Sequence, residues 1–393
     1  MNKKRVHTPE GVRDVYGIEY RRRSKLKEKL KDVFASYGYE GIRTPGFEFF
    51  DVFNSEKGTV SSRDMFKFFD REGNTLVLRP DVTPSIARCV AKYFSEEKAG
   101  IRLCYAGNVY LNNSSYQLKL KETCQLGAEL INDDSVQADS EVIAMAVDCF
   151  LAAGLRDFRI SIGEVEFFQG LTESIKDQEV KMELREFILN KNYFGLMEYI
   201  ENLEIPDRVK QVFLRFGELN GDVSILDQAE EMVENEVSKK ALARLRKVYE
   251  ILKLYGKEKY IGFDLGMLNK HNYYTGIIFK GYTYGTGDAV LKGGRYDNLI
   301  EQFGKKAPSV GFTIVLDEMM TALQRQGIAM EAESVHTMII YREELMADAI
   351  MKANELRRQG RSVILERQSA SRGKEDYEQF GEEHHLGEIL YFV

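Results

Sequence analysis

The stretch YAGNVYLNNSSYQLKLKETCQLGAE, residues 105–129, constrains the fold most, because its pattern predicts two strands joined by a polar loop. Small or apolar residues alternate along its first part, and the Asn and Ser residues at 112–115 are typical of a turn. In the second strand Gln125 and Glu129 lie an even number of residues apart, so both side chains point to the same face. That face is either a solvated edge of the sheet or the floor of a polar pocket.

The charge balance argues against non-specific binding of nucleic acid. The chain has 55 Lys and Arg residues against 62 Asp and Glu residues, which gives a formal net charge of −7. Its four cysteines have no metal-ligand spacing, and neither a signal-peptide pattern nor a membrane-spanning apolar run occurs. These features predict free thiols, no metal site, no membrane segment and a cytoplasmic location.

The order of helical and strand patterns predicts four parts. Residues 1–166 and 258–325 carry strand patterns with a few helices, one of them from about Ser140 to Ala153, and predict the two halves of one sheet. Between them, at 167–257, apolar residues recur at helical spacing and predict a helical insertion. After a predicted linker at 321–334, strand and helix patterns alternate over 335–393, as in a small α/β domain.

Several segments resemble the class II aminoacyl-tRNA synthetases in their histidyl form. The stretch at 105–129 resembles motif 2, and the strand broken by Pro45, with the helix before it, resembles motif 1. The other matching segments are LRPDVTP (78–84), NYYTGIIF (272–279), KGGRYDNLI (292–300) and the motif 3 segment VGFTIVLDEMM (310–320). The resemblance implies an α+β fold with a class II synthetase-like antiparallel sheet flanked by helices. It further implies a helical insertion, a truncated C-terminal domain like the anticodon-binding domain, and a homodimer through motif 1.

The resemblance also points to three positions at which the synthetases carry arginines for adenylation. In this chain these positions hold Leu111, Asn269 and Glu318. A leucine donates no hydrogen bond to a phosphate, and a glutamate repels the phosphates of ATP that an arginine would neutralise. The three substitutions therefore predict that the chain does not activate an amino acid.

The positions that read histidine in the synthetases keep suitable side chains. The resemblance implies that an acid, a hydroxyl and an amide hold the ammonium group, while a glutamate and a tyrosine pair read the imidazole. Thr83 has a second interpretation, as the cap of a helix that starts at Pro84, and the two roles are compatible. The candidate histidine-binding residues are Asp81, Thr83, Gln125, Glu129, Tyr273 and Tyr274.

This pocket keeps the residues that bind the amino acid in the synthetases and lacks the arginines that bind ATP. Such a pocket is typical of the histidyl-tRNA synthetase-like regulatory subunits of ATP phosphoribosyltransferase, a family that the whole chain resembles. The resemblance implies no catalysis and no cofactor of its own, and a short-form catalytic subunit as partner. That partner joins ATP to phosphoribosyl pyrophosphate, with release of pyrophosphate, in the first step of histidine biosynthesis. A homodimeric core inside a hetero-oligomer is implied as well, with histidine as the feedback effector. Whether histidine binds the synthetase-like pocket or a subunit interface stays open.

Two other functions fit parts of the sequence. An active histidyl-tRNA synthetase is opposed by the three lost arginines, and histidine-dependent exchange of pyrophosphate into ATP would reveal it. A tRNA-binding amino-acid sensor is opposed by the acidic composition and the short C-terminal domain, and a salt-dependent complex with tRNA would reveal it.

Overall fold

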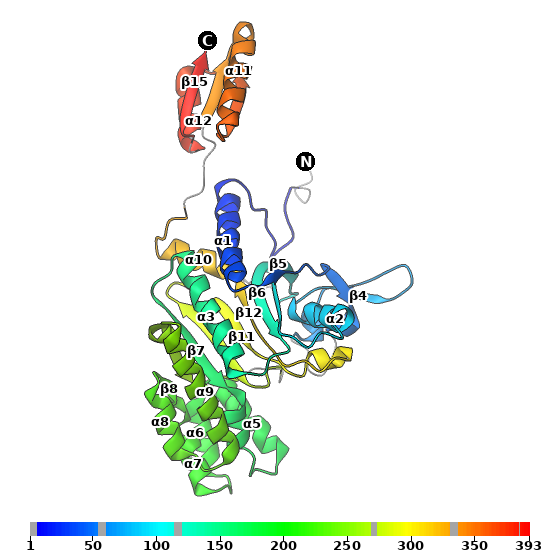
Figure 1. Ribbon diagram of the computed structural model, residues 1–393, viewed down its shortest axis with the longest axis vertical. Helices are drawn as coiled ribbons and strands as arrows, with labels where there is room; N and C mark the ends of the chain where they lie inside the picture. The colour runs from blue at the N-terminus through cyan, green and yellow to red at the C-terminus, as the bar shows by residue number, and fades with distance from the viewer. Residues whose placement is uncertain (1–5, 54–59, 114–119, 269–272, 331–336, 385) are drawn as a thin grey trace. The chain divides into compact units, whose positions relative to one another are not determined.

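The computed structural model describes residues 6–53, 60–113, 120–268, 273–330, 337–384 and 386–393, which form two units (Figure 1). The first unit comprises residues 1–14 and 26–329, and the second comprises residues 15–25 and 330–393. Helix α1 (Gly17–Ser36) contributes residues to both. The finer division into four parts stays a prediction.

A nine-stranded sheet organises the first unit, in the order β1-β5-β6-β12-β11-β10-β7-β9-β8. Neighbouring strands are antiparallel except β1 with β5 and β7 with β9, which are parallel. The central part therefore confirms the predicted antiparallel sheet. The strands are β1 (Glu40–Gly41), β5 (Ile101–Tyr110), β6 (Glu122–Ile131), β7 (Phe158–Glu164), β8 (Asn220–Gly221), β9 (Ile261–Asp264), β10 (Ile277–Thr283), β11 (Leu291–Arg295) and β12 (Ser309–Val315).

The predicted hairpin at 105–129 is confirmed as the pair β5 and β6. Gly107 pairs with Gln125, and Leu103 pairs with Glu129, along an uninterrupted antiparallel register. Because side chains alternate along β6, Leu126, Ala128 and Leu130 point away from Gln125 and are fully buried. One face of the hairpin is thus apolar core, and the opposite face carries the polar residues.

Two helices that follow strands differ in length from the sequence prediction. Helix α3 (Val136–Ala153) begins before Ser140 because the Ser135 hydroxyl caps it, accepting a hydrogen bond from the Ala138 amide at 3.1 Å. Helix α10 (Leu316–Arg325) continues into the predicted linker because Ala322 and Leu323 are buried where the helix packs near β6 and β12. Helix α3 packs along β6, β12, β11 and β10 (Figure 1).

The region between β7 and β9 is helical, as its periodicity predicts. It also contains the short strand β8, which pairs with β9 and which the sequence did not indicate. The helices lie at the β8 end of the sheet (Figure 1). They are α4 (Val165–Leu171), α5 (Gln178–Leu189), α6 (Tyr193–Glu201), α7 (Asp207–Leu214), α8 (Ser224–Met232) and α9 (Glu236–Leu254).

A buried ion-pair network fastens α9 and α3 to the end of β11. The Arg295 guanidinium donates to Asp139 Oδ1 at 2.7 and 3.0 Å, and Arg244 of α9 donates to Asp139 Oδ2 at 2.8 Å. Arg295 also donates to the Asp133 carbonyl at 2.9 Å. Asp139 is completely buried and Arg295 is only 3% exposed, so both charges depend on these partners.

A three-stranded antiparallel sheet, in the order β2-β4-β3, adjoins helix α2 (Thr83–Tyr93). Its strands are β2 (Phe47–Phe49), β3 (Lys67–Phe69) and β4 (Thr75–Leu78). In β2, Glu48 points inward to an ion pair of 2.8 Å with Arg88, while Phe47 and Phe49 are more than half exposed. The sheet therefore presents aromatic rings to its surroundings.

The second unit contains a parallel sheet in the order β14-β13-β15, made of β13 (Thr337–Tyr341), β14 (Val363–Arg367) and β15 (Glu388–Phe392). Helix α11 (Met346–Arg358) packs Ala349 and Ala353 on Ile339, and helix α12 (Lys374–Glu383) packs Tyr377 on Met338.

Within the described residues of the whole chain, no helix is long and apolar enough to cross a bilayer.

Candidate functional site

A cavity of about 550 Å³ opens on the polar face of the main sheet, over β6, β12 and β11. It is lined by all six residues that the sequence indicated as histidine readers, which come from three separate segments: Asp81, Thr83, Gln125, Glu129, Tyr273 and Tyr274. Strand alternation places Gln125 and Glu129 here, and the Thr83-Pro84 start of α2 places Asp81 and Thr83. The polar pocket floor, and not the solvated edge, is the correct interpretation of the hairpin.

Glu129 is the most deeply buried acid of the cavity. Its Oε1 accepts a hydrogen bond from the Thr83 hydroxyl at 2.9 Å, and its Oε2 accepts one from the Tyr296 hydroxyl at 2.5 Å. Burial raises the pKa of Glu129 to about 8, although the two hydrogen bonds act in the opposite direction. Near neutral pH the carboxyl is therefore mostly protonated, and a cationic ligand group beside it would favour its ionised form.

A glycine makes room for this carboxyl. Gly311 pairs with Glu129 across β12 and β6, and a Cβ at Gly311 would lie 1.6 Å from Glu129 Oε2. Any side chain at this position would displace the glutamate.

The remaining candidates surround Glu129 with polar groups. Gln125 Oε1 is buried and accepts no hydrogen bond from the described residues, so a donor on a ligand would satisfy it. Asp81 Oδ1 accepts hydrogen bonds from the amides of Val82 at 2.7 Å and Thr83 at 3.4 Å, which fixes the carboxylate at the start of α2. The rings of Tyr273 and Tyr296 are stacked, with centroids 5.3 Å apart, and close one side of the cavity.

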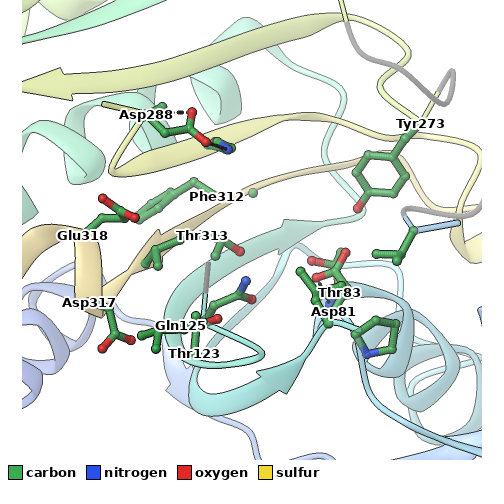
Figure 2. A pocket seen from close by; sticks show the side chains of 18 of the residues that line it. Asp81, Thr83, Thr123, Gln125, Tyr273, Asp288, Phe312, Thr313, Asp317 and Glu318 are labelled. Carbon is green, nitrogen blue, oxygen red and sulfur yellow. Dashed lines mark hydrogen bonds and ion pairs between the residues drawn. The ribbon is translucent and has the colours of Figure 1, made fainter. Parts of the chain in front are cut away.

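The other end of the cavity carries negative charge. Figure 2 shows Asp288, Asp317 and Glu318 at one side, Asp81, Thr83 and Tyr273 at the other, and Gln125 and Thr313 between them. Two of the three lost arginine positions, Leu111 and Glu318, line the cavity; the third, Asn269, lies outside the described residues. The described lining therefore offers no arginine to a phosphate.

Sequence reasoning missed two residues that define the floor of the cavity, Tyr296 and Gly311. A signal for Tyr296 was present: Lys292, Gly294 and Tyr296 alternate onto the same face as the cavity. For Gly311 no local signal exists, because its role depends on the register between β6 and β12.

Comparison with known proteins agrees with this architecture. Residues 11–319 match the family model described as histidyl-tRNA synthetase. The ATP phosphoribosyltransferase regulatory subunit of Acetivibrio thermocellus is 42% identical over 363 residues, covering 92% of this chain and 87% of that protein. The protein of the same name from Ruminiclostridium cellulolyticum is 35% identical over 393 residues, covering 100% of this chain and 93% of that protein.

Solved structures extend the likeness to the fold. A structure described as an ATP phosphoribosyltransferase regulatory subunit/histidyl-tRNA synthetase from Bacillus halodurans has a TM-score of 0.89 at 30% identity, covering 99% of this chain and 98% of that one. A histidyl-tRNA synthetase from a Nostoc species has a TM-score of 0.81 at 22% identity, covering 97% and 90%, and shows the shared fold.

Proposed function

The chain belongs to the histidyl-tRNA synthetase-like family of ATP phosphoribosyltransferase regulatory subunits, and on that premise we propose that it regulates, without catalysing, the first step of histidine biosynthesis. Its proposed partner is a short-form catalytic subunit, which it makes active and sensitive to histidine. The four cysteines form no disulfide, which fits the reducing cytoplasm in which we propose that the chain acts; they are Cys89, Cys104, Cys124 and Cys149.

One observation supports the proposal: the described residues of the cavity include groups that suit an amino acid, and they include no arginine for the α-phosphate of ATP. Thr83, Gln125 and Glu129 offer hydroxyl, amide and carboxyl groups within one buried cluster. Leu111 offers no donor, and Glu318 adds a negative charge on the same lining. A site with this composition supports recognition of an amino acid without its adenylation.

The test is reconstitution with the catalytic subunit. We expect that the short-form subunit alone turns over slowly and that addition of this chain raises its rate at least tenfold, a difference of about 1.4 kcal/mol in activation free energy. The chain alone should give no histidine-dependent exchange of pyrophosphate into ATP. Exchange at the rate of a histidyl-tRNA synthetase, or a catalytic subunit that is equally active alone, would contradict the proposal.

We propose free histidine as the effector and the cavity as its site. Asp81, Thr83 and Gln125 supply acceptors suited to an ammonium group, and Glu129 with Tyr274 suits an imidazole. Glu129 accepts from the imidazolium form when it is ionised and donates to neutral imidazole when it is protonated, so its raised pKa suits a ligand that itself titrates near neutrality.

We also propose a homodimer through the motif 1 region. Phe47 and Phe49 of β2 are 54% and 55% exposed, and Phe68 of β3, 37% exposed, packs its ring edge-on against Phe47 on the same face of the small sheet. An exposed group of aromatic rings of this kind is typical of an interface. Sedimentation should therefore show a dimer at micromolar concentration, and Phe49→Asp should shift it towards monomer, whereas Glu72→Ala in the exposed turn after β3 should not. A monomeric wild-type protein would refute this assembly.

A further inference from the structure

One row of residues crosses the sheet on the same face as the cavity. The register aligns Gly127 of β6 with Thr313 of β12, Thr313 with Lys292 of β11, Lys292 with Lys280 of β10, and Lys280 with Ser161 of β7. Side chains of directly paired residues point to the same face, so two lysines and two hydroxyl residues lie along one line. Lys292 lines the cavity, and Lys280 continues the row beyond it.

The two lysines form an unfavourable pair in the protein alone. Like charges directly opposite each other on neighbouring strands repel. Lys292 has an ion pair of 3.2 Å with Asp288, whereas Lys280 makes no hydrogen bond or ion pair with the described residues. Burial lowers the pKa of Lys280, and the positive charge of Lys292 lowers it further. An anion placed between the two ammonium groups would relieve this repulsion.

We propose that Lys280 and Lys292 bind a diphosphate group. A diphosphate carries anionic oxygens on both phosphorus atoms, so it can bridge the ammonium groups of two lysines that are paired directly on neighbouring strands. Ser161, next in the row, offers a hydroxyl donor on the same face. The inference rests on the proposed function for the source of this group, because the proposed partner's reaction consumes one diphosphate ester and releases free diphosphate.

The position of the lysine pair separates this site from the adenylation chemistry of the synthetases. The backbone of Lys292 lies two strands from β6, the strand that holds Gln125 and Glu129, and the backbone of Lys280 lies three strands from it, about 10 and 14 Å at the usual strand spacing. Asp288, the ion-pair partner of Lys292, lies at the side of the cavity opposite Asp81 and Thr83 (Figure 2), so an anion held by the lysines lies away from the groups proposed to hold the ammonium of histidine. Diphosphate binding is therefore compatible with the absence of amino-acid activation.

Two carboxylates near the lysines act as internal counter-ions. Asp288 pairs with Lys292, and Asp264 lies close enough to Lys280 to oppose the lowering of its pKa. A bound diphosphate must compete with Asp288 for Lys292. The two charge types therefore predict opposite effects: removal of a lysine weakens binding, and removal of the Asp288 charge strengthens it.

The experiment is calorimetric titration of inorganic pyrophosphate into this chain alone, in the absence of the catalytic subunit. Wild type is expected to bind one equivalent saturably, and Lys280→Gln and Lys292→Gln are each expected to bind at least tenfold more weakly. Asp288→Asn is expected to bind about threefold more tightly. The matched control is Lys240→Gln, an exposed lysine of α9 with the same change of charge, which should bind as wild type.

Circular dichroism of each variant checks that the fold is kept. The proposed site would be overturned if wild type, Lys280→Gln and Lys292→Gln bound pyrophosphate with equal affinity. It would also be overturned if Lys240→Gln lost as much affinity as the two site variants. Because the catalytic subunit is absent, failure of this titration leaves the reconstitution test untouched, and failure of reconstitution leaves this titration interpretable.

Discussion

Replacement of Arg295 with methionine is expected to lower the free energy of unfolding by about 3–5 kcal/mol, the usual effect of removing one partner of a buried ion pair. The substitution leaves the Asp139 carboxylate, which has no exposed surface, with Arg244 as its remaining ionic partner. Methionine keeps much of the volume of the arginine side chain. The loss in free energy of unfolding therefore measures the removed charge and its hydrogen bonds, and not a cavity. Urea denaturation followed by far-UV circular dichroism measures it, because the chain has no tryptophan.

The matched control is a surface ion pair in the same unit. Arg215 pairs with Glu218 at 2.9 Å, but both side chains are about half exposed or more, so Arg215→Met should cost at most about 1 kcal/mol. The double variant Asp139→Asn with Arg295→Met should lose less than the sum of the two single losses, because the partners are coupled. Equal losses in Arg295→Met and Arg215→Met would show that the buried network does not stabilise the unit.

Glu129→Ala is expected to weaken histidine inhibition of the reconstituted complex by about 10- to 100-fold, since a hydrogen bond to a charged group contributes about 1.5–3 kcal/mol. Asp81→Ala should weaken histidine inhibition to a similar extent, because it removes the carboxylate proposed to contact the ammonium group of histidine. Glu122→Ala, on the same strand but outside the cavity lining, is the control and should leave inhibition unchanged. Inhibition of activity by histidine, with and without each substitution, is the measurement.

Gly311→Ala tests the same site without removal of any polar group. Its methyl group would displace the Glu129 carboxyl, because a Cβ there approaches Oε2 to 1.6 Å. We expect the variant to lose histidine inhibition while it still assembles with the catalytic subunit. If Glu129→Ala, Asp81→Ala and Gly311→Ala all keep normal inhibition in an intact complex, the effector site lies elsewhere, such as the interface between the two kinds of subunit.

Features set by local chemistry were predictable from the sequence. The period of two along β6 placed Gln125 and Glu129 on one face, and Pro84 marked the first turn of α2. The expected helix cap at Thr83 is wrong, because Thr83 is the first helical residue and its hydroxyl donates to Glu129. Features set by distant partners were not. Arg295 and Asp139 are 156 positions apart, and nothing near either residue indicates the other. Likewise α10 continues into the predicted linker because Ala322 is buried against the sheet. The local sequence there favours neither helix nor loop, so packing against distant residues decides where the helix ends.

Arg295 and Tyr296 are neighbours in the chain, yet their side chains lie on opposite faces of the sheet. Arg295 belongs to the buried ion-pair network that joins α3 and α9 to β11, here called the anchor, whereas Tyr296 donates a hydrogen bond to Glu129 in the cavity. Local unfolding at the end of β11 must therefore break both contacts at once. The anchor and the cavity floor then belong to a single cooperative unit, whose amides are expected to exchange with solvent together in hydrogen exchange. A ligand that holds Glu129 and Tyr296 in place would slow exchange in α9 as well, although it touches no residue of that helix.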